Sequence, residues 1–86
     1  MYKILIEKTA AKFLSKLDAK SYQLISNVIK KLRYFQEIKN LDVKPLKGKF
    51  RGMMRLRIGT RRILFTVEGR EREIKIWLIE NRGNTY

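Results

Sequence analysis

Three arginines at strand spacing, Arg55, Arg57 and Arg62, are the residues of this chain best suited to chemistry. They lie in the segment RGMMRLRIGTRRILFTV, residues 51–67, where apolar and basic residues alternate on both sides of Gly59-Thr60. Alternation around a tight turn predicts an antiparallel hairpin. Because residues i and i+2 of a strand share a face, Arg55 and Arg57 point the same way, and the returning strand brings Arg62 close to them.

The three arginines lack a neutralising neighbour in the sequence, because no acidic residue lies between Asp42 and Glu68. Like charges that face one another across strands destabilise a sheet. We therefore infer either an anionic ligand for this face or a solvated face with arginines for solubility, and the spacing alone favours neither. Guanidinium groups can donate paired hydrogen bonds to a phosphate, but they stay protonated and are poor bases.

The charge of the whole chain points to a polyanionic partner. Its 86 residues hold 21 lysines and arginines against 8 acidic residues, a net charge of +13. Eight of the nine arginines follow residue 50, whereas the first half relies on lysine. This balance indicates RNA, DNA or an acidic protein as the partner. We expect no membrane partner, since no amphipathic helix sets bulky aromatics opposite a basic face near a terminus.

The length and composition predict a single domain over residues 1–86. A hydrophobic content of 44% and one proline argue against disorder. No apolar run is long enough for a membrane span, and the start MYKILIEK does not resemble a signal peptide. The absence of cysteine and histidine excludes a disulfide framework and the usual zinc sites. A cytoplasmic location fits this composition.

Hydrophobic periodicity predicts one strand and two helices in the first half. Residues 2–7 alternate as a strand. Thr9 and Asp18 are the expected N-caps of the two helices, because their side-chain oxygens can accept a backbone N–H bond. One apolar stripe of the second helix is expected to pack into the core: Tyr22, Ile25, Val28, Ile29, Leu32 and Phe35.

The second half is predicted to hold a connector and three strands. Residues 40–49 form the connector, since Pro45 stops a helix and restricts Lys44 to extended geometry. Basic residues line it and could track phosphates or simply face solvent: Lys44, Lys47, Lys49 and Arg51. The last strand, residues 73–79, should place Ile74, Ile76 and Leu78 on one face and Lys75, Trp77 and Ile79 on the other.

The predicted fold class is α+β, with the order β-α-α-β-β-β. An N-terminal helical hairpin would cover one face of a mostly antiparallel four-stranded sheet. The other face would carry Arg55, Arg57 and Arg62, and sheet twist would leave it open and concave. Because Arg62 alternates with Ile63 and Phe65, we expect an Arg62→Ala change to leave no core cavity and to affect function only.

Three segments occur together in this order. They are PLKGKFRGMMRLRIGTRRILFTV (residues 45–67), EIKIWLIENRG (residues 73–83) and the ending Arg82-Gly-Asn-Thr-Tyr86. With the element order and the basic composition, they resemble the RelE/ParE superfamily of bacterial and archaeal toxins, whose hairpin, last strand and terminal R-x-x-x-Y they match. The resemblance covers essentially the whole chain and implies a RelE-like fold and a toxin of a type II toxin–antitoxin pair.

In the RelE branch, the resemblance implies an endoribonuclease that cleaves mRNA in the ribosomal A site by attack of the RNA's own 2′-OH, without a metal or other cofactor. Catalytic roles are implied for Arg62, Arg82 and Tyr86. Arg55 and Arg57 match the family's basic pair, and the RNA-binding set would be completed by the connector residues Lys44, Lys47, Lys49 and Arg51. The implied partners are a cognate antitoxin protein, the ribosome and mRNA.

The resemblance leaves two points open. Some relatives place a histidine near the last motif or an arginine where Glu80 lies, so the group that moves protons is not identified. Without the resemblance, Tyr86 is a frayed chain end and Arg82 a surface charge. The alternative function is non-enzymatic: a ParE-like DNA gyrase inhibitor or an inactive member that only binds antitoxin and nucleic acid. The Arg82 and Tyr86 pair favours the ribonuclease, because the gyrase-inhibiting branch usually lacks it.

Overall fold

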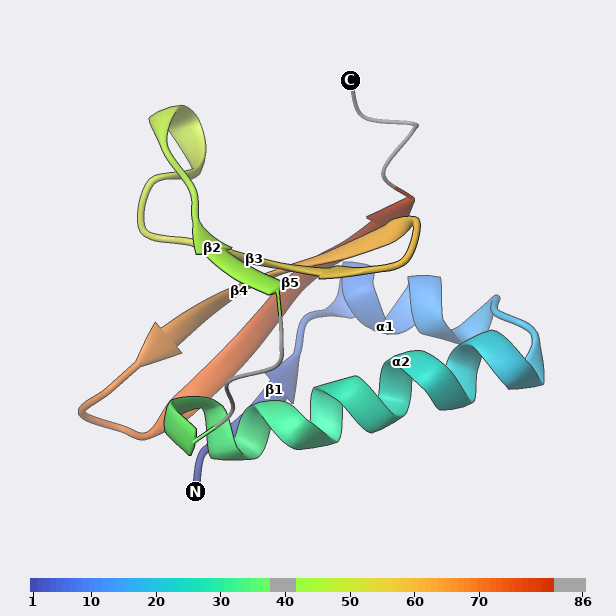
Figure 1. Cartoon of the computed structure of the whole chain (residues 1–86), viewed down its shortest axis with the longest axis horizontal. Helices are drawn as coiled ribbons and strands as arrows, with labels where there is room; N and C mark the ends of the chain where they lie inside the picture. Colours follow the sequence, from blue (N-terminus) through green and yellow to red (C-terminus); the bar gives the residue numbers. More distant parts are fainter. Residues whose placement is uncertain (38–41, 82–86) are drawn as a thin grey trace.

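A helical hairpin covers one face of a five-stranded mixed sheet in the computed structural model, which describes residues 1–37 and 42–81 (Figure 1). The elements are β1 (Lys3–Ile6), α1 (Lys8–Ser15), α2 (Ala19–Lys31), the 3₁₀ turn η1 (Leu32–Glu37), β2 (Asp42–Pro45), the 3₁₀ turn η2 (Gly48–Phe50), β3 (Met54–Ile58), β4 (Arg61–Glu68) and β5 (Glu73–Asn81). The strand order is β1-β5-β4-β3-β2, with β1 parallel to β5 and the other pairs antiparallel. None of the helices described in residues 1–37 and 42–81 is long and apolar enough to cross a membrane.

The predicted α+β order is confirmed, but the sheet has five strands and not four. The missing strand is β2, which was predicted to be part of a connector. It pairs with β3 from Asp42 opposite Arg57 to Pro45 opposite Met54. A strand of four residues with a single partly buried apolar side chain, Val43, has almost no alternation to detect. Proline is tolerated there because β2 is an edge strand.

The helices differ from the prediction at their ends. Asp18 caps α2 as predicted, and its carboxylate accepts a hydrogen bond from the Ser21 backbone N–H at 3.1 Å. Thr9 does not cap α1, which begins at Lys8 after Glu7 and has no side-chain cap. Core packing was predicted for Tyr22, but this is wrong, since its exposed fraction is 47%.

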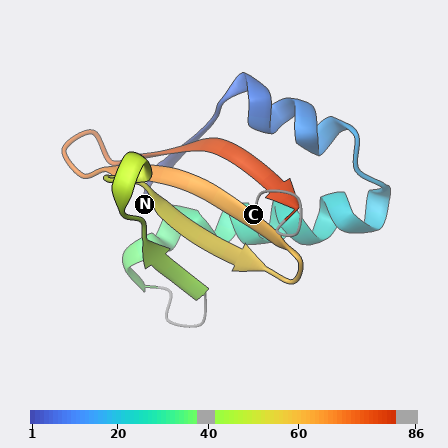
Figure 2. The same cartoon turned by 90° about the horizontal axis from the view of Figure 1, so that it is seen from above.

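The core lies between the helices and the sheet. Seen from above, α2 passes behind the strands (Figure 2). The fully buried members of the core include Ile25 and Leu32 of the predicted stripe, while the side chain of Phe35 lies outside the described part of the chain. The regular helical geometry behind the stripe ends inside η1, after Leu32, because Tyr34 has non-helical backbone angles. The remaining core is supplied mainly by Leu56, Ile63, Phe65, Ile74, Ile76 and Ile79 of the sheet.

A β-bulge in β5 changes which side chains reach each face. Leu64 pairs with Leu78 whereas the next residue, Phe65, pairs with Ile76, so Trp77 is an extra residue in β5. Because a single inserted residue reverses the alternation after it, Ile79 enters the core and Leu78 lies on the opposite face. The predicted faces of Leu78 and Ile79 are therefore wrong.

The Asp18 cap makes helix stability depend on pH. Hydrogen bonds from Ser21 lower the pKa of this carboxyl below its ordinary value of 3.8. A lowered folded-state pKa stabilises the fold above the unfolded value, and this contribution is lost as pH falls through the folded value. We expect Asp18→Ala to melt a few degrees below wild type at pH 7, and the difference to shrink below about pH 4.

Thermal melts followed by circular dichroism at pH 7 and pH 3 would measure this effect. Asp18→Asn is the matched control, because it keeps the hydrogen-bond acceptor and removes the titration. Equal melting temperatures for Asp18→Ala and wild type at pH 7 would contradict the assignment.

Candidate nucleic-acid interface

The sheet face opposite the helices carries the three arginines singled out in the sequence. Arg57 of β3 lies directly opposite Arg62 of β4, and Arg55 lies opposite Leu64. Cross-strand partners share a face, so the prediction that these guanidiniums gather on one face is confirmed. Figure 1 shows the helices on one side of the sheet and the η2 connection rising on the other, which leaves this arginine face uncovered by helices.

Two carboxylates reach the arginine face from neighbouring strands. Asp42 of β2 lies 3.6 Å from Arg55 (Oδ1 to Nη2) and 3.9 Å from Arg57 (Oδ2 to Nε). Glu80 of β5 lies opposite Arg62, whose Nε donates a hydrogen bond to Oε1 while its Nη2 forms an ion pair with the same oxygen. The expectation of three unneutralised arginines is therefore wrong, since strand pairing supplies acids that are distant in sequence.

Burial separates the roles of these arginines. Arg55 and Arg62 each have an exposed fraction of 8%, whereas the side chain of Arg57 is 41% exposed. Removing one partner of a buried ion pair costs about 3–5 kcal/mol, but an exposed pair contributes only about 0–1 kcal/mol. Arg62 is therefore held in place by Glu80, while Arg57 can exchange Asp42 for an external anion at little cost.

Arg55 has a further property that suits an anion site. Its Nη1 is buried and has no hydrogen-bond partner among the described residues. An unmatched buried donor costs about 1–3 kcal/mol, so an acceptor that reached this nitrogen would recover that free energy. Arg55 thus combines one ion pair, to Asp42, with one donor that no described residue uses.

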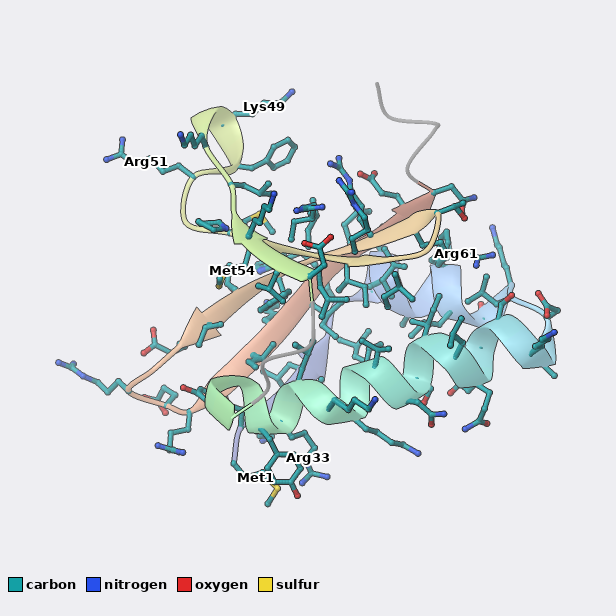
Figure 3. The ribbon with its side chains drawn as sticks, viewed as in Figure 1. Met1, Arg33, Lys49, Arg51, Met54 and Arg61 are labelled. Atoms are coloured by element: carbon teal, nitrogen blue, oxygen red, sulfur yellow. The ribbon has the colours of Figure 1, made fainter. Side chains whose placement is uncertain are left out.

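A basic rim borders the arginine face along β2 and η2. Lys44 lies on the edge strand opposite Arg55, and Lys47, Lys49 and Arg51 are exposed around η2. Figure 3 shows Lys49 and Arg51 extending from the tip of this connection, on the opposite side of the molecule from Arg33. Residues 43–67 contain no acid, so the rim adds positive charge without internal compensation. A role for this rim in tracking phosphates stays a prediction.

Next to the arginines, an apolar hollow of about 460 Å³ that the sequence did not reveal lies where this face meets the start of α1. Its lining consists of Thr9, Phe50, Met53, Leu64, Thr66, Trp77 and Leu78. Its two aromatic residues are partly exposed, with exposed fractions of 37% for Phe50 and 39% for Trp77. Only the bulge in β5 brings Trp77 and Leu78 to this face together.

Two predicted site residues lie outside the part of the chain that the structure describes. Arg82 and Tyr86 lie outside residues 1–37 and 42–81, so their catalytic roles stay predictions. Arg61, the neighbour of Arg62, alternates to the helix side, where its positive charge helps to lower the pKa of Asp18. The sequence analysis missed Asp42, Glu80 and Phe50 as site residues, and none of them has a local pattern that marks it. Strand alternation gave the face of Trp77 but not its place in the hollow.

Comparison with solved structures decides the family. No protein-family model and no curated protein matches the sequence. The structure is nevertheless similar to an archaeal RelE-RelB complex from Pyrococcus horikoshii, at 27% identity over 98% of each chain with a TM-score of 0.80. The chain belongs to the RelE/ParE superfamily of toxins. The resemblance predicted from the hairpin, the last strand and the element order is confirmed.

Other superfamily members repeat this similarity. A RelB-RelE antitoxin–toxin complex from Methanococcus jannaschii is 25% identical over 95% of this chain and 94% of its own, with a TM-score of 0.74. The RelBE2 toxin–antitoxin complex from Mycobacterium tuberculosis, at 21% identity and a TM-score of 0.79, covers 94% of this chain and 98% of its own and shows the shared fold.

Proposed function

We propose that this RelE/ParE-superfamily protein is the toxin of a type II toxin–antitoxin system and that it cleaves mRNA in the ribosomal A site. One observation carries the proposal. The open sheet face combines an exposed guanidinium, Arg57, with two buried ones, Arg55 and Arg62, next to a basic rim. That arrangement suits an RNA backbone, since arginine forks match phosphate oxygens in pairs.

The chemistry proposed for this face follows from what RNA cleavage requires. Attack of a 2′-OH on the adjacent phosphate needs the two groups in line, stabilisation of the charge on the phosphorane-like transition state, and proton transfer. Arg57 donates to the phosphate, and Arg62, held by Glu80, supplies a charge whose orientation is set before the substrate binds.

Proton transfer requires a different group, because arginine stays protonated. The resemblance assigns this role to Tyr86, together with Arg82 as a further cation. Glu80 is the second candidate for the base, since it lies on the same face beside Arg62. The scheme uses no metal or other cofactor.

Primer extension on cellular mRNA after induction tests the proposal. We expect cuts in phase with codons, and we expect Arg57→Ala to reduce cleavage on programmed ribosomes by about 10²-fold, the loss typical for one transition-state donor. Arg33→Ala is the matched control, because it removes an exposed arginine on the other side of the molecule (Figure 3). Intact mRNA after induction would contradict the proposal, as would equal losses for both variants.

The second candidate function is a non-enzymatic one, either inhibition of DNA gyrase or binding of antitoxin and nucleic acid alone. The carboxylates of Asp42 and Glu80 favour it, because they offset two of the three positive charges on the arginine face. Intact mRNA together with blocked supercoiling after induction would place gyrase inhibition first. An arrest of protein synthesis before any change in supercoiling would favour the ribonuclease.

The partner that controls this toxin is expected to be an acidic or amphipathic antitoxin segment. The superfamily relatives from P. horikoshii and M. jannaschii are complexes of RelE with RelB. A net charge of +13 makes the free domain repel itself, and a complementary chain relieves that repulsion. We expect co-expression with the neighbouring reading frame to restore growth and the complex to survive moderate salt, because apolar burial adds to the charge pairing.

Pull-down of the two chains at about 0.1 M and 0.5 M salt would measure this stability. A neighbouring product that neither binds the toxin nor restores growth would contradict the expectation.

A further inference from the structure

We propose that the apolar hollow between Phe50 and Trp77 binds a nucleobase of single-stranded RNA, next to the phosphate-binding arginines. The proposal rests on the nucleic-acid function proposed above and names a subsite of the same face. Its starting point is two large aromatic residues, each more than a third exposed, in a domain whose other sheet face buries its apolar side chains.

The backbone of β5 and a hydrogen bond set the direction of the Trp77 side chain. Trp77 faces away from the core residues Ile74 and Ile76, as strand alternation requires, and the bulge between the Leu64–Leu78 and Phe65–Ile76 pairs brings Leu78 to the same face beside it. Bulges recur where a strand must re-aim a side chain at a functional site. The indole N–H of Trp77 donates to Thr66 Oγ1 at 3.0 Å, which fixes the orientation of the ring.

The ring of Phe50 is presented by a constrained turn. Gly48 (φ +69°) and Gly52 (φ +94°) have left-handed backbone angles on either side of it, and such angles are strained for other residues. The turn is closed by hydrogen bonds from Arg51 N to Gly48 O at 3.1 Å and from Met53 N to Phe50 O at 3.0 Å. Phe50 and Met53 therefore form the wall of the hollow that faces Trp77 from the rim.

The charge around the hollow identifies the class of occupant. Lys49 Nζ lies 5.5 Å from the centre of the Phe50 ring, and Lys75 Nζ lies 4.2 Å from the centre of the Trp77 ring. Lys75 also pairs with Glu7 at 3.5 Å, so Lys49 brings the charge that is less compensated. Aromatic platforms beside ammonium and guanidinium groups are the usual means of binding single-stranded nucleic acid, in which bases and phosphates alternate.

A base fits this hollow better than an apolar side chain from an acidic protein. The hollow adjoins Leu64, whose partner across the sheet is Arg55, so a stacked base would place its flanking phosphates toward the guanidiniums. Every base has a π-face, so stacking on Phe50 and Trp77 gives affinity without demanding one sequence. A peptide offers no repeated phosphates for the rim and the arginine face together.

Trp77 is the only tryptophan in the chain, so its fluorescence reports directly on the hollow. The probe is a 2′-O-methyl RNA trinucleotide, which cannot be cleaved by 2′-OH attack. The control ligand is an abasic trimer with the same phosphates. We expect the trinucleotide to quench Trp77 fluorescence with saturation, and the abasic trimer to bind about five- to a hundredfold more weakly without quenching. Free N-acetyl-tryptophanamide in the same solutions corrects for light absorbed by the bases.

Variants of the full chain make the test specific. We expect Phe50→Ala to weaken trinucleotide binding by about five- to a hundredfold while leaving the Trp77 signal available, and Phe50→Tyr to retain binding. Tyr22→Ala is the matched control, because it removes an exposed aromatic from α2 instead. Thermal melts of each variant confirm that it is folded before binding is compared.

Three outcomes would overturn the inference. The trinucleotide and the abasic trimer could bind alike without quenching, Phe50→Ala could bind as tightly as wild type, or an acidic peptide could quench Trp77 where RNA does not. The proposed ribonuclease has a separate readout, the cleavage of mRNA on programmed ribosomes. If the wild-type protein cleaves mRNA on programmed ribosomes but fails the quenching test, the proposed function stands and the proposed base site is wrong.

Discussion

Replacing Arg62 with alanine will lower the free energy of unfolding by about 3–5 kcal/mol, because the change leaves a carboxylate in the sheet without its counter-ion. Glu80, with 17% of its side chain exposed, receives both a hydrogen bond and an ion pair from Arg62. Small domains are stable by only about 5–15 kcal/mol, so the loss is a large share of the total. The sequence predicted an unaffected fold, since it revealed the outward direction of Arg62 but not its partner.

Changing both partners will recover most of this stability. Arg62→Met combined with Glu80→Leu removes both charges at once, and exchanging a buried pair for apolar residues of similar volume is often neutral. The double variant is therefore expected to be more stable than Arg62→Ala and to remain inactive. Unfolding in urea, analysed by linear extrapolation, gives each free energy.

Arg57→Ala is the matched control for Arg62→Ala, because both remove an arginine from the same face. Arg57 is exposed and its pairing with Asp42 is long, so its loss should cost less than about 1 kcal/mol. Loss of activity in Arg57→Ala without loss of stability would separate the ligand contact from the structural ion pair. Equal stability of Arg57→Ala and Arg62→Ala would show that the Arg62–Glu80 pair does not support the fold.

Replacing Tyr86 with phenylalanine will slow mRNA cleavage by about 10²–10⁴-fold, the usual contribution of a general acid or base. The resemblance of the ending Arg82–Tyr86 to the superfamily's terminal R-x-x-x-Y implies this role for Tyr86. An unperturbed phenol has a pKa of about 10, and nearby guanidiniums would favour its ionised form. The substitution removes one oxygen and keeps the ring, so stacking on a base survives while proton transfer does not.

Single-turnover cleavage on programmed ribosomes measures this loss without interference from product release. Tyr34→Phe is the matched control, since it removes a hydroxyl from an exposed tyrosine in η1. Ribosome binding and thermal stability should be unchanged in both variants. Cleavage by Tyr86→Phe at the wild-type rate would exclude Tyr86 as the base and make Glu80 the next group to substitute.

Local spacing in the sequence was sufficient for much of the fold. Asp18 was identified as a helix cap because a cap acts on a backbone N–H three residues away. The hairpin that joins β3 and β4, and the shared face of Arg55, Arg57 and Arg62, followed from period-two geometry around a short turn. Each of these features depends on residues within about one turn or one hairpin of each other, so the pattern and the structure agree.

Only the tertiary structure decided how the arginine face is composed. Asp42 meets Arg57 through strand pairing between β2 and β3, and Glu80 meets Arg62 across β4 and β5, although 15 and 18 residues separate the partners in the chain. The bulge that brings Leu78 to the face of Trp77 and turns Ile79 into the core depends on the register between β4 and β5. Register across a sheet is set by packing of the whole core and not by local periodicity, so the sequence alone predicted the basic residues of the site but neither their acidic partners nor the aromatic hollow beside them.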